Sequence, residues 1–396
     1  MKDDPYTDKM ALACTDKMTL EKQLSDSITS FSFDLYKKAA QSAGDTNMFV
    51  SPSSIFTVLA MLHAGARNNT LAEMTSTLKL QNFETPSSYD DMGKFLSLLT
   101  KGSNSVTLNC ANRLYPNADR SIIETYLLLV KRCFSSTVKS LDYKKDPEGC
   151  RNEINDWVET ETKKKIKDLL PSGSITSDTG MVVVNAIYFK GDWLTTFASF
   201  DTMKRDFSKN KATRIKVEMM NKKFQNVRYG DSQPLDCTSL EMYYKGKDHG
   251  LVVLLPKELE GLAGLESKLT LETMRAVMAS LVRETVIVSL PKFKMESSLK
   301  LKPMLAMLGI KDAFDMNKAD FTGDQLFLSE VFHKTFVDVN EEGTEAAAAT
   351  AGVMMVGCAF NEDKPLEFKA DHPFLFMIWD HRIDAPLFVG RFCGPQ

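Results

Sequence analysis

Few side chains in this 396-residue chain have the type and spacing to act as nucleophiles, bases or metal ligands. None of the five histidines stands in the HExxH pattern of zinc proteases, and none is paired with a cysteine at metal-ligand spacing. The GxSxG, GxxxxGK(S/T) and GxGxxG motifs are absent. We therefore expect no enzymatic activity, no metal and no other cofactor. A Ser–His–Asp triad built from distant residues would leave no local motif, so that alternative stays open.

The overall composition indicates a globular protein with a substantial core, since 43% of the residues are hydrophobic and 26% are charged. The formal net charge is -3 and the isoelectric point lies near 6.1. Neither value favours a general attraction to nucleic acid or to anionic lipid. No uninterrupted apolar stretch reaches the ~18 residues of a membrane span. We expect no nucleic-acid partner and no membrane insertion.

The cysteines are odd in number, scattered, and never in CxxC spacing. They are Cys14, Cys110, Cys133, Cys150, Cys237, Cys358 and Cys393. This pattern favours free thiols in a reducing compartment over a disulfide framework. The N-terminus over 1–18 is acidic and lacks the apolar run of a secretory signal. As written, the chain is predicted to be cytoplasmic. An extracellular protein from which a signal peptide has been removed is the open alternative.

Helical patterns dominate the first 170 residues and strand patterns the rest, which predicts an α+β fold. Helices are expected over 20–40, 51–66, 70–79, 89–100, 121–134, 148–168, 265–282 and 301–309. Strands are expected over 180–191, 240–258 (two strands), 284–296, 327–340, 372–380 and 385–392. The run over 180–191 is apolar enough to be a central strand covered on both faces. No linker divides the chain, so we predict a flexible extension over 1–19 and a single domain over 20–396.

One stretch has a different predicted secondary structure from its neighbours: residues 341–360 have the sequence EEGTEAAAATAGVMMVGCAF. By intrinsic propensity its alanines should form a helix. However, the residues directly before it, over 336–340, are short and β-rich, and the segments after it also have strand patterns. An alanine-rich segment between strands therefore needs another explanation than helix formation.

Five motifs, in order along the chain, resemble the serpin family from about residue 25 to the C-terminus. They are FVSPSSI (49–55), NAIYFKGDW (185–193), SLPKFKMESSLKLKPMLAMLGIKDAF (289–314), LSEVFHKTFVDVNEEGTEAAAAT (328–350), and the pair HPFLFMIWD (372–380) with APLFVGRF (385–392). Any one could arise by chance, but five in the family's order are specific. On these motifs the chain is identified as a member of the serpin family.

The resemblance implies a serpin fold with three β-sheets, eight or nine helices and an exposed reactive-centre loop at about 341–365. It also implies that the protein is a monomeric inhibitor and not an enzyme. A target serine protease attacks the loop and becomes acyl-linked to it. The cleaved loop then inserts into the main sheet as an added strand. The alternatives are a non-inhibitory serpin acting as carrier, storage protein or chaperone, and an inhibitor of papain-like cysteine proteases.

The first half of the loop is expected to be the hinge that inserts. It comprises Glu342, Gly343, Thr344, Glu345, Ala346, Ala347, Ala348, Ala349 and Thr350. Because side chains alternate along a strand, an inward Thr344 places Ala346, Ala348 and Thr350 on the covered side and Glu345 on the other. Small side chains avoid the overpacking strain of roughly 1–3 kcal/mol that a bulky residue would add. The composition therefore suits insertion.

The second half of the loop contains the expected reactive bond. Counting from Gly343 as the family does places this bond between Gly357 and Cys358. The loop is longer than the family norm, so Met355, Val356 and Phe360 stay open as alternatives. None of these residues is basic, which favours an elastase-like or chymotrypsin-like target, with a papain-like cysteine protease as the alternative.

The resemblance also assigns supporting residues. Ser53, Ser54, Asn185 and His333 match a buried polar cluster at the point where strands must separate to admit the loop, here called the sheet-opening cluster. Trp193 matches the position where the loop enters the sheet. Lysine and arginine are sparse over 80–100, so we expect no glycosaminoglycan cofactor. The Asn-x-Thr sequon at Asn68 is either structural or glycosylated.

Overall fold

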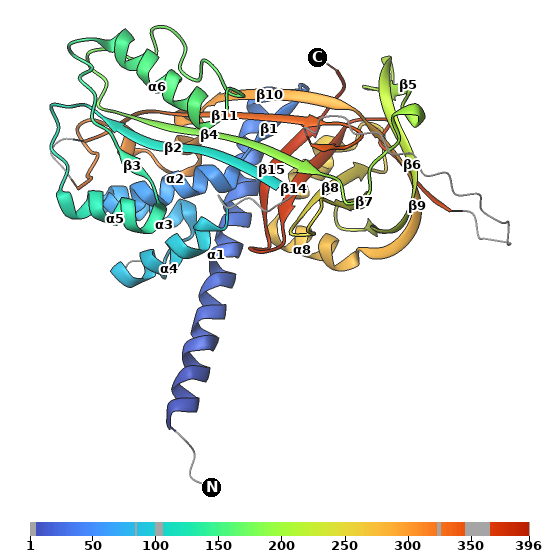
Figure 1. Ribbon diagram of the computed structural model, residues 1–396, viewed down its shortest axis with the longest axis horizontal. Coiled ribbons are helices and arrows are strands. Elements are labelled where there is room, and N and C mark those ends of the chain that lie inside the picture. The colour runs from blue at the N-terminus through green and yellow to red at the C-terminus, as the bar shows by residue number, and fades with distance from the viewer. Residues whose placement is uncertain (1–4, 84, 100–105, 323–325, 345–364, 396) are drawn as a thin grey trace.

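The computed structural model describes residues 5–83, 85–99, 106–322, 326–344 and 365–395 (Figure 1). The helices in this part of the chain are α1 (Pro5–Ala43), α2 (Pro52–Gly65), α3 (Asn68–Leu78), α4 (Pro86–Ser97), α5 (Glu124–Phe134), α6 (Pro147–Glu161), α7 (Leu262–Lys268), α8 (Leu271–Ser280) and α9 (Lys302–Leu308). These nine helices, counted over the described ranges, agree with the eight or nine that the resemblance implied.

The described strands form two hydrogen-bonded sheets. They are β1 (Met48–Val50), β2 (Val106–Pro116), β3 (Thr137–Val138), β4 (Met181–Asp192), β5 (Met203–Ser208), β6 (Arg214–Ser232), β7 (Cys237–Tyr243), β8 (His249–Pro256), β9 (Val282–Pro291), β10 (Phe293–Lys300), β11 (Leu328–Val339), β12 (Gly343–Thr344), β13 (Leu366–Lys369), β14 (Phe374–Asp380) and β15 (Ala385–Phe392).

Helix α1 begins earlier than the sequence patterns indicated. A flexible extension over 1–19 was expected, but the helix begins at Pro5 and continues into the predicted helix over 20–40. Proline is tolerated in the first helical turn, and neither proline nor glycine occurs again before Gly44. Nothing in the local sequence therefore interrupts the helix until Gly44, whose positive φ of 58° ends it. In Figure 1 the N-terminal part of α1 extends away from both sheets.

The six-stranded sheet has the order β10-β11-β12-β4-β2-β3 and is covered on both faces. One face of β4 packs into the main core through Val183, Ile187 and Phe189. Its other face, with Val184 and Tyr188, packs into a second cluster that includes residues of α6. Figure 1 shows α6 on one side of this sheet and α2 on the other. The prediction of a central strand buried on both faces is confirmed.

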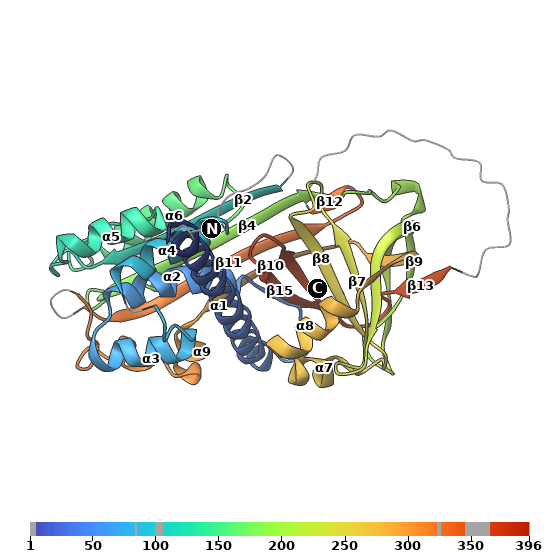
Figure 2. The same cartoon turned by 90° about the horizontal axis from the view of Figure 1, so that it is seen from below.

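The nine-stranded sheet contains the described strands that lie outside the six-stranded sheet. Its path runs β1-β15-β14-β8-β7-β6-β9-β13, with β5 paired to β6. The strand β6 is 19 residues long. It pairs with β5 near its start, with β9 along its length and with β7 near its end, with a register shift between Phe224 and Val227. This one long strand connects both parts of the larger sheet (Figure 2). Counted by hydrogen bonds among the described strands, there are therefore two sheets, because β6 connects strands into one large sheet, and not the three that the resemblance implied.

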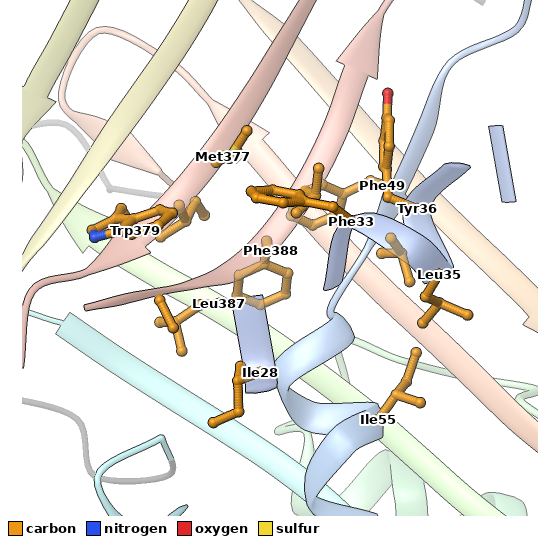
Figure 3. Packing of buried hydrophobic residues seen from close by; sticks show 14 of the residues in the cluster. Ile28, Phe33, Leu35, Tyr36, Phe49, Ile55, Met377, Trp379, Leu387 and Phe388 are labelled. Carbon is orange, nitrogen blue, oxygen red and sulfur yellow. The ribbon is translucent and has the colours of Figure 1, made fainter. Parts of the chain in front are cut away.

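Helices α1 and α2 pack against β15 at the centre of the molecule. Phe49 on β1 stacks on Phe388 of β15, with ring centroids 4.9 Å apart. Figure 3 shows these rings beside Ile28 of α1 and Ile55 of α2, and all four side chains are fully buried. Each such side chain stabilises the fold by roughly 1.5–3 kcal/mol. This packing fixes the start of α2 beneath the six-stranded sheet.

Candidate functional site

The start of α2 is anchored by serine side chains that do not cap the helix. Pro52 occupies the first turn, where its missing N–H is no loss. The Ser51 hydroxyl donates to the Leu387 carbonyl at 2.7 Å. Ser53 likewise donates to the Pro386 carbonyl, so both serines attach α2 to β15. The sequence predicted helix-start chemistry here, and these serines bind the neighbouring strand instead.

His333 connects α2 to the six-stranded sheet. Its Nε2 accepts a hydrogen bond from the Ser51 backbone N–H at 3.1 Å. Its Nδ1 must then carry the ring proton and donate to Asn185 Oδ1, which lies 2.5 Å away. Burial lowers the pKa of His333 to about 3. The ring is therefore neutral near pH 7, and the two contacts select one tautomer.

Asn185 extends this network across two further elements. Its Nδ2 donates to Ser54 Oγ at 2.6 Å and to Asn112 Oδ1 at 2.5 Å. Asn112 lies on β2 directly opposite Asn185. The structure thus brings Ser54, Asn185 and His333 together, whereas Ser53 bonds β15 beside them. Asn112 was missed by sequence reasoning, because the strand that carries it, β2, was not predicted.

We expect stability to fall as the pH is lowered through the range set by His333. Its pKa is 6.5 in the unfolded chain and about 3 in the folded protein. Below pH 6.5 the unfolded chain takes up a proton that the folded protein cannot, so acid favours unfolding until about pH 3. At pH 5 this one group should cost about 2 kcal/mol relative to neutral pH.

Urea unfolding of wild type and His333→Gln between pH 7.5 and 4.5 tests this expectation. The variant should show a shallower loss of stability with falling pH. Burial also lowers the pKa of His63, to about 4, so part of the slope should persist in the variant. Identical slopes for the two proteins would contradict the assignment to His333.

Trp193 lies where the chain leaves β11 toward the loop. The indole is fully buried and stacks on Tyr244 with centroids 4.6 Å apart. Its Nε1 donates to the Asn340 carbonyl at 2.8 Å, and its backbone N–H donates to the Glu342 carbonyl at 2.8 Å. The residue predicted at the loop entry therefore holds two points of the segment that precedes the loop.

Two residues of the expected hinge already lie between β4 and β11. In β12, Gly343 and Thr344 pair antiparallel with Asp192 and Gly191 of β4, and Thr344 pairs with Val339 of β11. A Cβ on Gly343 would lie 2.1 Å from the Gly191 carbonyl oxygen, so only glycine fits this approach. The strand separation therefore begins at β12.

Thr344 points toward the main core. Its side chain is fully buried, and its Oγ1 lies 2.8 Å from the Tyr244 hydroxyl. Tyr244 belongs to the main core cluster and was not singled out from the sequence. Its only sequence signal is an aromatic residue beside the turn that joins two predicted strands.

An ion pair holds the residues just before the hinge. The carboxylate of Glu341 lies 2.9 Å from Lys292 Nζ and accepts from the Thr202 hydroxyl at 2.9 Å. Burial raises the pKa of Glu341, but these contacts outweigh it and the net pKa lies below its ordinary value. Glu341 is therefore ionised near neutral pH, and it ties the loop's first end to the body of the protein.

The remaining predicted loop residues lie outside the described residues. These are Glu345, Ala346, Ala347, Ala348, Ala349 and Thr350 of the hinge, and Met355, Val356, Gly357, Cys358 and Phe360 at the expected reactive bond. The described chain resumes with Pro365, and β13 pairs with β9 from Leu366 onward. The loop is thus attached at β12 and at β13.

The described residues contain neither a cluster of metal ligands nor a membrane-spanning helix. No group of three or more His, Cys, Asp or Glu side chains among them could hold a metal ion. None of the helices in the described ranges has the length and apolar character needed to cross a membrane.

The fold and this site define an α+β protein in which the start of a loop is held between β4 and β11 of the six-stranded sheet. Residues 26–395 match the family model described as "Serpin (serine protease inhibitor)", and the chain belongs to the serpin family. Iris of Ixodes ricinus is 40% identical over 378 residues, covering 94% of this chain and 99% of that protein. The human leukocyte elastase inhibitor is 38% identical over 387 residues, covering 94% of this chain and all of that protein.

A solved structure confirms the fold. Serpin48 of the insect Tenebrio molitor superposes with a TM-score of 0.81 at 31% identity, covering 94% of this chain and 98% of that chain. The serpin fold implied by the sequence motifs is therefore confirmed. Serpins are protease inhibitors and not enzymes, so the prediction of no enzymatic activity is confirmed through the family.

Proposed function

We propose that this protein is a suicide-substrate inhibitor of an elastase-like or chymotrypsin-like serine protease. The protease cleaves the loop, stays acyl-linked to it, and is trapped when the cleaved loop inserts between β4 and β11. The observation that carries the proposal is β12, which already hydrogen-bonds to both of these strands. Insertion then extends an existing strand and needs no new starting point.

The register of β12 indicates how far insertion must proceed to reach the sheet-opening cluster. Thr344 is opposite Gly191 on β4 and Val339 on β11. Continuing both pairings antiparallel, one residue at a time, brings Thr350 opposite Asn185 and, independently, opposite His333. These two residues are each other's partners in the present β4–β11 pairing. The two registers agree, so the arriving Thr350 must separate Asn185 from His333.

The same register supports the position of the reactive bond. The strand β4 begins at Met181 and β11 at Leu328. Continued pairing reaches these ends with Met354 and Met355, respectively. Gly357 and Cys358 follow two to four residues later, where a cleaved end would leave the sheet. Cleavage at this bond therefore supplies a strand as long as the opening it must fill.

The choice of target rests on the residues around the bond and on the relatives. No basic residue occurs over 353–360, which disfavours trypsin-like proteases. A curated relative at 38% identity is named leukocyte elastase inhibitor. Both observations favour a protease with a small or apolar primary pocket.

A panel of elastase, chymotrypsin, trypsin and papain tests the proposal. We expect elastase or chymotrypsin to form a complex that survives denaturing electrophoresis at the summed mass. Acylation at Gly357 breaks the bond to Cys358, so the C-terminal peptide should separate from the complex on denaturation and begin at Cys358. Clean cleavage by every protease without any complex would reject inhibition and would favour a non-inhibitory serpin.

A further inference from the structure

A cavity of about 440 Å³ lies along the outer edge of β2, next to the segment that follows α5 and the C-terminal part of α6. This volume is in the range of small-molecule sites. On one edge β2 pairs with β4 over its whole length, but on the other it pairs with β3 only at Arg113 and Leu114. Figure 1 shows β2 running between α5 and α6. The short β3 therefore leaves this edge open to the cavity.

Arg113 lines the cavity and makes no ion pair with a described carboxylate. Its guanidinium carbon lies 3.9 Å from the ring centroid of Trp157 on α6, and its buried Nε has no acceptor among the described residues. The nearby Tyr115 does not supply a negative charge: burial raises its pKa to about 12, despite a smaller lowering by Arg113. A half-buried cation without a counter-charge is costly, so the site favours an anion.

Asn109 provides a second unsatisfied donor in the same cavity. Its buried Nδ2 has no acceptor in the described part of the chain. Asn109, Ala111 and Arg113 share one face of β2, because side chains alternate along a strand. Ala111 lies between the two donors and adds no polar atom. Two of the residues that line the cavity, Asn109 and Arg113, therefore each contain a buried donor atom that has no acceptor among the described residues.

The other walls restrict the kind of anion. Leu108, Phe134 and Trp157 supply apolar surface, which suits a ligand with an apolar body. The carboxylate of Glu161 lies at the exposed rim. One cation cannot neutralise a dianion such as phosphate, and Glu161 would repel it further. A planar carboxylate carries a single charge and accepts paired hydrogen bonds from a guanidinium.

We propose that this cavity binds a small organic monocarboxylate with an aromatic or alkyl body. Arg113 is its counter-ion and Asn109 its second donor, while Trp157 and Phe134 contact the apolar body. The site lies on the far side of β4 from β11 and is separate from the loop-insertion path. The proposal of a carboxylate site can therefore be tested independently of the proposed inhibition.

Titration of the full chain with 3-phenylpropanoate tests the proposal. Trp157 is partly exposed, whereas Trp193 and Trp379 are buried elsewhere, so ligand binding should change the tryptophan emission mainly through Trp157. We expect saturable binding of 3-phenylpropanoate. The neutral 3-phenylpropanamide and inorganic phosphate should bind at least about tenfold more weakly. This ligand series uses the wild-type chain and does not depend on the folding of any variant.

Two variants test whether Arg113 provides the positive charge that binds the carboxylate. Arg113→Met should weaken 3-phenylpropanoate binding by about tenfold or more. Arg205→Met, which removes an exposed arginine from β5, should leave the affinity unchanged. Equal affinities for the acid and the amide, no saturable binding at millimolar concentration, or an unchanged affinity in Arg113→Met would each overturn the proposal.

Discussion

Thr344→Arg is expected to convert the protein from an inhibitor into a substrate. Thr344 is fully buried between β4 and β11 with its hydroxyl against Tyr244. An arginine there would have to bury a charge among core residues before the loop could insert. Each additional ~1.4 kcal/mol of barrier slows insertion about tenfold. Hydrolysis of the acyl bond should then release the protease first.

The measurement is the number of inhibitor molecules consumed per protease inhibited, together with the yield of stable complex. For Thr344→Arg we expect consumption to rise by more than about tenfold and the complex to disappear. Thr213→Arg is the matched control, because it places the same charge at an exposed turn between β5 and β6. If Thr344→Arg still formed the complex in full yield, insertion through β12 would be wrong.

His333→Ala is expected to destabilise the native fold by about 3–5 kcal/mol. The change removes a fully buried ring and leaves the Ser51 N–H and Asn185 Oδ1 without their partner. Both a cavity and two unsatisfied polar groups then contribute to the loss. The free energy of unfolding in urea at pH 7.5 measures the effect.

Thr335→Val is the control on the same strand. It removes a single buried hydrogen bond, from the Thr335 hydroxyl to the Phe49 carbonyl, and should cost about 1–2 kcal/mol. A double-mutant cycle of Asn185→Ala with His333→Ala should also show a coupling energy of roughly 0.5–3 kcal/mol. Additive effects would mean that the two residues do not act as one network.

Much of the site could be predicted because its residues lie in motifs that recur in one order. Asn185 and His333 were assigned from different segments, and the structure joins them by a hydrogen bond. The assignment of faces along the hinge assumed that the Thr344 side chain points inward. In the structure that side chain lies in the core, against the Tyr244 hydroxyl. Local patterns also predicted β7 and β8, because a turn rich in lysine and glycine separates them and β8 is almost entirely apolar.

The missed elements have physical reasons. Polar residues at Asn109, Asn112 and Arg113 interrupt β2, so its sequence lacks a clear strand period. Long β6 was missed because six of its residues are lysine, arginine or glutamate, which leaves few apolar positions to indicate a strand. The contact between Asn112 and Asn185 depends on register between strands far apart in sequence, which no local pattern contains.

The strands around β12 do not all run in the same direction. Among the long strands, β10–β11 and β4–β2 pair antiparallel, while β11 and β4 pair parallel. A strand extending β12 would run antiparallel to both neighbours and would replace one ladder by two of the more stable kind. The intact chain cannot reach that arrangement while its loop is tethered at β12 and β13. Under the proposed mechanism the intact protein is a kinetic trap that cleavage of one peptide bond releases irreversibly, so each molecule acts only once.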